Sequence, residues 1–380
     1  MPSLKKKTPS TVAPKTAPTI ASKVAAQPKN TKAAQPAPER KAKQAAAQST
    51  PPQSLQAQPK VAVKKTASQA KTEAQAQVKD HGIQLLQLTA KGQQTNDPAF
   101  TAYEPNKGNM GFSELLDAVC MAQKDPALQK TKLWGLLTAD FAKRTGLTGQ
   151  DLLAVIEANP GYELYYACAH PELEALYHNP WRSPEITHPG FVALSRRFLK
   201  AAGLSDVPVD AISHSSLFAT GHLMVGSPAF WEKYVTFVQT VFGQVQKNMN
   251  KADQEKLFRE PSVPGRMSYL ALIVARLLNV FLMLKNSDFR AFKIPLPEQE
   301  KAMNTHLRFL REMKDLGLQD KSKWHLAAWV NYRGLYLAHV MGKAWVMKHI
   351  QPITPTELHA AVPIAKVHNP YITSIPAALP

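Results

Sequence analysis

The polar residues whose types and spacing could carry out chemistry gather between positions 163 and 227. Glu185 and His188 stand three residues apart, so one turn can place a carboxylate and an imidazole on the same face. This arrangement is typical of acid–base catalysis, and we expect Glu185 and His188 to be catalytic. Histidines at irregular spacing are also common as hydrogen-bonded structural residues, and we expect no metal ion here.

Substrate-binding residues are expected around this pair. The segment NPWRSPEITHPG, residues 179–190, combines rigid, aromatic and charged side chains, as loops that line binding sites often do. Arginine suits anionic groups, and a helix N-terminus can receive a phosphate. Each feature also has a structural explanation: loop packing for tryptophan, solvation for arginine, helix capping for serine. The expected binding residues are Glu163, Trp181, Arg182, Arg196, His222 and Ser227.

Apolar segments of two kinds alternate along the chain and must position these residues. Short apolar runs bounded by turn residues predict strands at 82–90, 133–139, 162–169, 216–227 and 289–295. Helical spacing with capping residues predicts helices at 112–123, 148–159, 191–204, 228–249, 268–285, 298–316 and 324–350. This alternation favours an α/β fold with a mostly parallel or mixed central sheet flanked by helices. Ligands in such sheets bind at the carboxyl ends of the strands.

The chain divides into four parts by composition. Residues 1–80 contain no aromatic residue and no glycine, and they predict a disordered tail. Residues 81–296 are expected to form the α/β domain, and 297–350 a C-terminal helical cap. Residues 351–380 are punctuated by proline and predict an extended tail.

The N-terminal part also carries most of the charge. Residues 1–80 hold 15 lysines and arginines against 3 acidic residues, a net charge of +12, whereas the whole chain has +18. Such an arm binds polyanions weakly and with a strong salt dependence, or it serves only as a solubilising tether. No apolar stretch follows its first basic residues, so we do not expect a signal peptide.

The apolar segment from Ser268 to Leu284 raises the question of a membrane span. It has 17 residues, with Arg276 and Asn279 near its middle. A spanning helix needs about 20 apolar residues and a central arginine is costly in lipid, so we expect a buried core helix. The two cysteines, Cys120 and Cys168, form no CxxC motif and suit a cytoplasmic protein.

Three ordered blocks of the sequence carry a resemblance to a known group. They are KLWGLLTADFAKRTG (132–146), GYELYYACAHPELEALYHNPW (161–181) and GHLMVGSPAFWEKY (221–234). Together they make residues 81–295 similar to uncharacterised bacterial proteins associated with surface-polysaccharide loci and glycosyltransferases. This chain departs from the group's pattern at Glu163, at residues 182–184 and at His222.

The resemblance implies a GT-A-type, Rossmann-like fold that binds a nucleotide sugar, with a glycan as acceptor. GT-A enzymes commonly hold a divalent ion with an Asp-x-Asp pair, and this chain has none. We therefore expect a metal-independent glycosyltransferase without a cofactor, in which arginines or a helix N-terminus meet the diphosphate. The alternative is a non-enzymatic binding protein with a degenerate α/β scaffold and a polyanion-binding tail.

Overall fold

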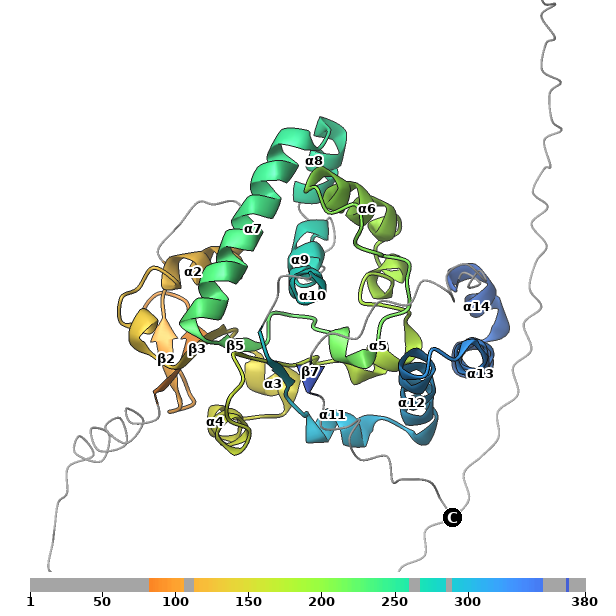
Figure 1. Cartoon of the computed structure of the whole chain (residues 1–380), viewed down its shortest axis with the longest axis horizontal. Coiled ribbons are helices and arrows are strands. Elements are labelled where there is room, and N and C mark those ends of the chain that lie inside the picture. Colours follow the sequence, from red (N-terminus) through yellow and green to blue (C-terminus); the bar gives the residue numbers. More distant parts are fainter. Residues whose placement is uncertain (1–81, 106–112, 260–266, 285–288, 351–366, 369–380) are drawn as a thin grey trace, which may run out of the picture. The chain divides into compact units, whose positions relative to one another are not determined.

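The computed structural model describes residues 82–105, 113–259, 267–284, 289–350 and 367–368 (Figure 1). The predicted disordered tail, residues 1–80, lies outside the described residues. Of the predicted extended tail, only residues 367–368 are described.

A mixed seven-stranded sheet lies at the centre of the described residues. Its order is β2-β1-β3-β5-β4-β6-β7, and every pairing is parallel except the two that β5 makes with β3 and β4. The strands are β1 (Ile83–Leu88), β2 (Phe100–Tyr103), β3 (Leu133–Leu137), β4 (Leu164–Tyr166), β5 (Met224–Gly226), β6 (Ala291–Lys293) and β7 (Val367–His368). The α/β class with a mixed sheet is therefore confirmed.

Helices cover both faces of the sheet, because side chains alternate between the faces along each strand. Trp134 and Leu136 of β3 join one apolar cluster, while Leu133 and Leu137 join another on the opposite face. Figure 1 shows α7 and α10 on one side of the sheet and α4 on the other. The helices of these layers are α2 (Glu114–Ala122), α3 (Phe141–Thr145), α4 (Gly149–Ala158), α6 (Phe191–Ala201), α7 (Pro228–Asn248), α8 (Lys251–Phe258), α9 (Tyr269–Val274) and α10 (Leu277–Met283).

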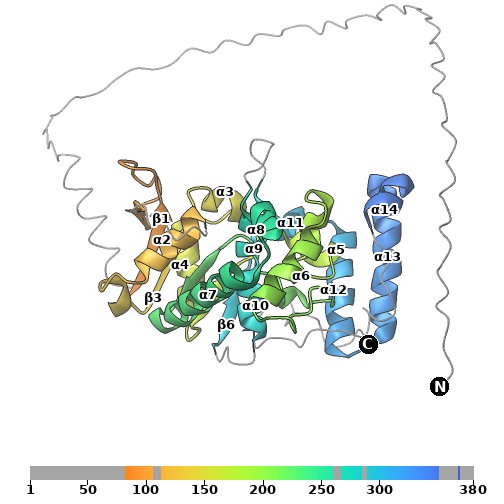
Figure 2. The same ribbon diagram turned by 90° about the horizontal axis from the view of Figure 1, so that it is seen from above.

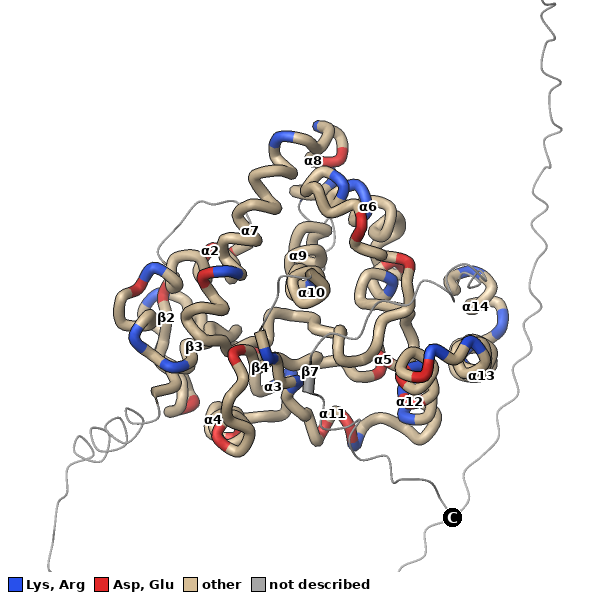
Figure 3. The backbone as a smooth tube through the Cα atoms, viewed as in Figure 1, with Lys and Arg blue, Asp and Glu red and all other residues tan. Residues whose placement is uncertain are grey.

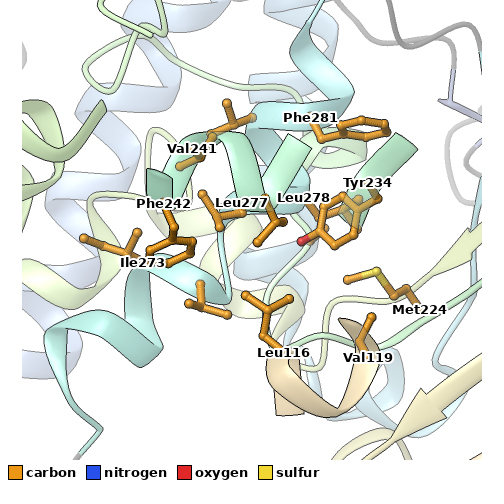
Figure 4. Close-up of a cluster of buried hydrophobic side chains, with 14 of the residues drawn as sticks. Leu116, Val119, Met224, Tyr234, Val241, Phe242, Ile273, Leu277, Leu278 and Phe281 are labelled. Atoms are coloured by element: carbon orange, nitrogen blue, oxygen red, sulfur yellow. The ribbon is translucent and has the colours of Figure 1, made fainter. Parts of the chain in front are cut away.

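The larger cluster forms the main core. Leucine, valine and aromatic side chains of α2, α7, α9 and α10 meet there, as Figure 4 shows for Leu116, Phe242, Leu277 and Phe281. The Trp231 indole stacks on Trp134 at 4.5 Å between centroids and donates a 2.8 Å hydrogen bond to the Trp134 carbonyl. This contact ties α7 to the middle of the sheet.

The C-terminal helices are α11 (Pro297–Ala302), α12 (Thr305–Gln319), α13 (Lys323–Met341) and α14 (Lys343–His349). Of these, α12 and α13 pack against α5 (Pro171–Leu176), and α14 packs against α13. Leu310, Leu318 and Trp329 share a cluster with Ala175, and the Trp329 indole donates a 2.9 Å hydrogen bond to the Ala175 carbonyl. Figure 2 shows α12 and α13 side by side, with the short α14 at the end of α13.

Capping residues explain several helix boundaries that the sequence predicts. The side chains of Ser113, Thr148 and Ser227 each accept a hydrogen bond from a first-turn backbone N–H of α2, α4 and α7. The helix predicted at 298–316 is two helices, because Asn304 caps a new start at α12. The helix predicted at 324–350 is also two, since Gly342 separates α13 from α14.

The apolar segment 268–284 forms two short helices instead of one. Arg276 interrupts it, and its buried guanidinium donates to the carbonyls of Leu272 and Pro180 at 2.7 and 2.6 Å. The side chain of Asn279 bonds the backbone of Ala219 through both its oxygen and its nitrogen. None of the described helices combines the length and apolar character that a membrane crossing requires.

One strand prediction needs correction, and the sequence predicts neither β2 nor β7. Only Met224–Gly226 of the predicted strand 216–227 is a strand, and residues Ser215–Leu217 form a 3-10 helix, η4. Side chains satisfy that turn's donors in place of a neighbouring strand: the Ser215 N–H bonds Asp315, and the Ser216 N–H bonds His214. Strand β2 was not predicted, because its four residues are too few to show an alternating pattern.

Candidate functional site

The loop 179–190 is fixed by hydrogen bonds within the protein. Asn179 organises it: its side-chain nitrogen donates to the carbonyls of Val209 and Ala211 at 2.8 and 2.7 Å, and its oxygen accepts from the N–H of Trp181 at 2.9 Å. Trp181 is 2% exposed and stacks on Phe191 at 6.4 Å between ring centroids. Its indole therefore packs the loop against α6.

The two residues predicted to be catalytic also have structural partners. The Glu185 carboxylate accepts from the N–H of Gly190 and of Val192, both at 2.7 Å, and so caps the first turn of α6. His188 is buried between the Thr187 hydroxyl at 2.9 Å and the Met267 carbonyl at 2.8 Å. Both of its ring nitrogens thus have a partner.

The two predicted arginines of this region share one carboxylate. Arg182 bonds Asp210 at 2.7 Å, and Arg196 on α6 forms a two-pronged ion pair with the same side chain. Their charges are thereby partly balanced inside the protein.

Glu163 and Ser227 lie together at the amino end of β4. The Glu163 carbonyl accepts a 2.8 Å hydrogen bond from the Ser227 N–H, and its carboxylate accepts a 2.7 Å bond from the Arg290 N–H. The Ser227 hydroxyl accepts from the Phe230 N–H at 3.1 Å and caps α7. These two predicted binding residues therefore join β4, β5 and β6 at one edge of the sheet.

His222 lies at the opposite edge, where β5 begins beside the carboxyl end of β4. It adopts a left-handed backbone conformation with φ of 58°, which is uncommon for any residue other than glycine. The ring is 8% exposed, and its Nε2 has no hydrogen-bond partner among the described residues. Burial, assisted by the nearby Arg144 charge, lowers the pKa of His222 to about 4.

The predicted residues accordingly occupy three places and do not converge on one hollow. Glu163 and Ser227 mark the amino edge of the sheet, and His222 marks the carboxyl edge. The remaining five belong to the loop 179–190 and α6: Trp181, Arg182, Glu185, His188 and Arg196. Whether any of the eight contacts a substrate stays a prediction.

The carboxyl edge brings together polar groups that the sequence gave no reason to join. Arg144 of α3 donates to the Gly221 carbonyl at 3.3 Å, across 77 positions of the chain. A Cβ atom at Gly221 would lie 1.9 Å from a guanidinium nitrogen of Arg144, so glycine is required for this approach. A tight Gly-His pair before a strand is the only signal that the sequence offers.

Two further residues of this edge follow β4. The buried Cys168 thiol lies 3.4 Å from the Thr220 hydroxyl, and burial raises its pKa to about 12, so it stays a thiol. His170 is exposed and its Nδ1 lies 3.2 Å from the Glu172 carboxylate. This carboxylate can orient the imidazole and leaves Nε2 as the nitrogen that faces other partners.

A second polar cluster is buried between the sheet and α12. Lys293 donates to the Glu174 carboxylate at 2.5 Å and to the Ser215 carbonyl at 2.8 Å, and Arg311 lies 3.8 Å from Glu174. Lys314 lies 4.4 Å from the Phe218 ring centroid, and burial lowers its pKa to about 8. The cluster connects α5, β6 and α12, and sequence reasoning missed it because its members are up to 140 positions apart.

In the part of the chain that the structure describes, no three His, Cys, Asp or Glu side chains are grouped so as to hold a metal ion. Comparison with protein-family models, curated proteins and solved structures finds no match for this chain.

Proposed function

We propose that this protein is a glycosyltransferase-like nucleotide-sugar-binding protein whose ligand occupies the carboxyl edge of the sheet, around Arg144, His170 and His222. The observation that carries the proposal is the contact of Arg144 with the strained Gly221–His222 turn, which precedes the antiparallel strand β5 and lies beside the carboxyl ends of β3 and β4. Strained backbone of this kind clusters at ligand sites. The GT-A-type assignment and a role in bacterial cell-surface glycan assembly belong to the same proposal.

The strand order supports this position for the ligand. The chain passes from β1 to β2 on one side and then to β3 on the other side of β1. Such a reversal creates a crevice outside the carboxyl ends of the strands, which is where open α/β sheets bind ligands. Asp140 and Arg144 follow the carboxyl end of β3, at the start of α3 and within it, and β3 is one of the two strands at which the strand order reverses.

The charges available at this edge suit a diphosphate without a metal ion. Arg182 and Arg196 already pair with Asp210, so Arg144 is the better candidate for the phosphate oxygens. In a transfer step, the acceptor hydroxyl gives its proton to His170 Nε2 while its oxygen bonds the sugar. The bond between the sugar and the diphosphate breaks, and the nucleoside diphosphate leaves with its new charge beside Arg144.

A binding screen tests the proposal on the full chain. The melting temperature is measured with a panel of nucleotide sugars and with the matching nucleoside diphosphates, with and without Mn²⁺. We expect at least one nucleotide sugar to stabilise the protein, to a similar degree in both conditions. No stabilisation by any member of the panel would contradict the proposal.

Two matched variants test the role of the His170–Glu172 pair once a ligand is known. His170→Gln should abolish sugar transfer and leave ligand binding intact, because the base acts on the acceptor. Glu172→Gln should reduce transfer by about tenfold to a hundredfold, since it orients His170. Full transfer activity in His170→Gln would remove this residue from the mechanism.

A non-enzymatic role is the second candidate, and the charge distribution favours it. The net charge of +12 within residues 1–80 suits a polyanion, and the residues predicted as a site in the loop are occupied by internal bonds. Gel shifts of the full chain with nucleic acid over a salt series, with Lys5, Lys6 and Lys7 changed together to Gln, test this reading. A weakened, salt-sensitive shift supports it, and a salt-insensitive result rejects it.

A further inference from the structure

The C-terminal helices expose large apolar side chains. The described part of the chain has eight large hydrophobic residues that are strongly exposed, and six of them lie on α12, α13 and α14. They are Phe309, Trp324, Leu335, Val340, Met341 and Met347, of which Trp324 and Met347 are 79% and 78% exposed. This concentration exceeds the scattered exposed leucine that any surface shows.

Two of the exposed apolar residues of α13, Trp324 and Leu335, share one side of the helix, whereas Val340 and Met341 at its C-terminal end point in other directions. Trp324 and Leu335 are 11 positions apart, close to three full turns, and the exposed Asn331 lies between them on the same side. Leu326 and Trp329 point to the other side, where they pack against α5 and α12. The outer face is therefore available, while the inner face holds the helix in place.

The charge of these helices has a single sign. Residues 323–349 contain Lys323, Arg333, Lys343 and Lys348 and no Asp or Glu. Figure 3 shows this as basic residues without acidic ones along α13 and α14. The three lysines are exposed, whereas Arg333 is buried against Trp329. Tryptophan, methionine and leucine beside lysine are the residues that interfacial helices present to lipid.

We infer that the outer face of α13 and α14 docks on the surface of a lipid bilayer that contains anionic lipid. The apolar side chains, led by Trp324 and Met347, enter the boundary between headgroups and acyl chains. Lys343 and Lys348 contact the anionic headgroups, and their aliphatic stems lie along the apolar boundary. The inference is independent of any reaction at the sheet edge, and it places the protein at a membrane surface without requiring any of the described helices to cross the bilayer.

The first experiment measures co-sedimentation of the full chain with phosphatidylcholine vesicles that contain phosphatidylglycerol. The variant combining Trp324→Ser and Met347→Ser should bind at least about tenfold more weakly, because two anchors are lost. The matched control is Phe258→Ser, which removes a 41% exposed apolar residue of α8. Equal loss in the control, or no binding by the unchanged protein, would overturn the inference.

The second experiment separates this face from the basic N-terminal segment. Lys343→Gln with Lys348→Gln should weaken binding by roughly tenfold, and Lys5→Gln with Lys6→Gln removes the same charge elsewhere. The inference requires the larger loss for the first pair. An equal or larger loss for the second pair would assign binding to the N-terminal segment and overturn it.

Fluorescence quenching locates the contact directly. Vesicles with brominated acyl chains should quench the emission of the full chain, and Trp324→Phe should remove most of the quenching. Unchanged quenching would place another tryptophan in the bilayer and contradict the inference. If Trp324→Ser with Met347→Ser instead shifts the oligomeric state and leaves vesicle binding unaltered, the face joins two copies of the chain, and the lipid assignment fails.

Discussion

The loop 179–190 and the sheet edge at 219–222 contrast in how their polar groups are used. In the loop, the polar side-chain atoms of Glu185, His188 and Asn179 form hydrogen bonds with backbone groups and neighbouring side chains. At the edge, His222 is held in a left-handed conformation, and its buried Nε2 has no hydrogen-bond partner among the described residues. Polar groups whose hydrogen bonds are all made within the protein are typical of a structural loop. A buried polar atom without a hydrogen-bond partner lowers stability, and a bound ligand can supply the missing partner.

The contrast shows that a high density of polar residues in the sequence does not identify a site. The loop attracts attention because its prolines, tryptophan and charges are consecutive. The edge is built from single residues of α3 and of the segment before β5, so it becomes visible only in three dimensions. Substitutions in both regions test this difference.

Arg276→Met should have the largest effect, because it removes the anchor of the loop. The buried guanidinium bonds the carbonyls of Pro180 and Leu272, and both would lose a charged donor. We expect the free energy of unfolding to fall by about 3 kcal/mol, measured by urea denaturation. Arg197→Met is the control: it breaks an ion pair of a 46% exposed side chain with Asp253 and should cost less than about 1 kcal/mol. Equal effects would mean that Arg276 does not anchor the loop.

His222→Asn tests the carboxyl edge through the pH dependence of the free energy of unfolding. Because the folded-state pKa, about 4, lies below the ordinary 6.5, the unfolded chain binds the proton first as the pH falls. The stability contributed by neutral His222 is complete above pH 6.5 and is lost as the pH falls toward 4. His222 should therefore account for about 2 kcal/mol of the loss between pH 7 and pH 5.

Asparagine tolerates the left-handed conformation and does not titrate, so His222→Asn should flatten the pH dependence in that window. Urea denaturation at pH 7 and pH 5 measures the difference. The exposed His339→Asn serves as the control and should leave the slope unchanged. The same slope in His222→Asn and the unchanged protein would show that His222 is not held neutral.

Gly221→Ala tests the close approach of Arg144. The substitution strains a backbone with φ of 92° and displaces the guanidinium, so we expect a loss of about 1 to 2 kcal/mol. Gly203→Ala is the matched control, since φ is 77° there and a Cβ atom would meet nothing within 4 Å. Gly203→Ala should lower the free energy of unfolding only through backbone strain. It should keep the stabilisation by nucleotide sugars, which Gly221→Ala should lose.

Glu185→Ala should have the smallest effect. It removes the acceptor for the N–H groups of Gly190 and Val192, and losing such a cap costs about 1 kcal/mol of stability. Thermal denaturation measures the loss, and Glu312→Ala on the exposed side of α12 is the control. If Glu185→Ala instead abolished a nucleotide-sugar response without lowering stability, the loop would be the site after all.

Much of the fold could be predicted from the sequence, because strong local signals fix it. The apolar run of residues 133–137 predicts β3, and the capping residues Thr148 and Ser227 predict where α4 and α7 begin. The 3-10 turn at Ser215–Leu217 could not be predicted, since Asp315, 100 positions away, satisfies its backbone. The break at Arg276 likewise depends on the distant Pro180 carbonyl.

The candidate site was less predictable than the fold. Local spacing predicts Glu185 and His188 as catalytic residues, but their hydrogen-bond partners are structural. At the carboxyl edge, the sequence predicts His222 as a binding residue and gives no reason to choose Arg144. Contacts between residues far apart in the sequence decide which polar groups have hydrogen-bond partners within the protein and which have none. A single sequence carries no direct record of those contacts.

We propose that the ligand binds at the carboxyl edge of the sheet and not at the loop 179–190. The most direct test compares the dissociation constant of a stabilising nucleotide sugar for Arg144→Gln and Arg196→Gln, measured by calorimetry on the full chain. We predict binding weakened at least about tenfold in Arg144→Gln, because a charged hydrogen bond to phosphate is lost, and unchanged in Arg196→Gln. Unchanged binding in Arg144→Gln with a loss in Arg196→Gln would contradict this proposal and place the site at α6 and the adjoining loop 179–190.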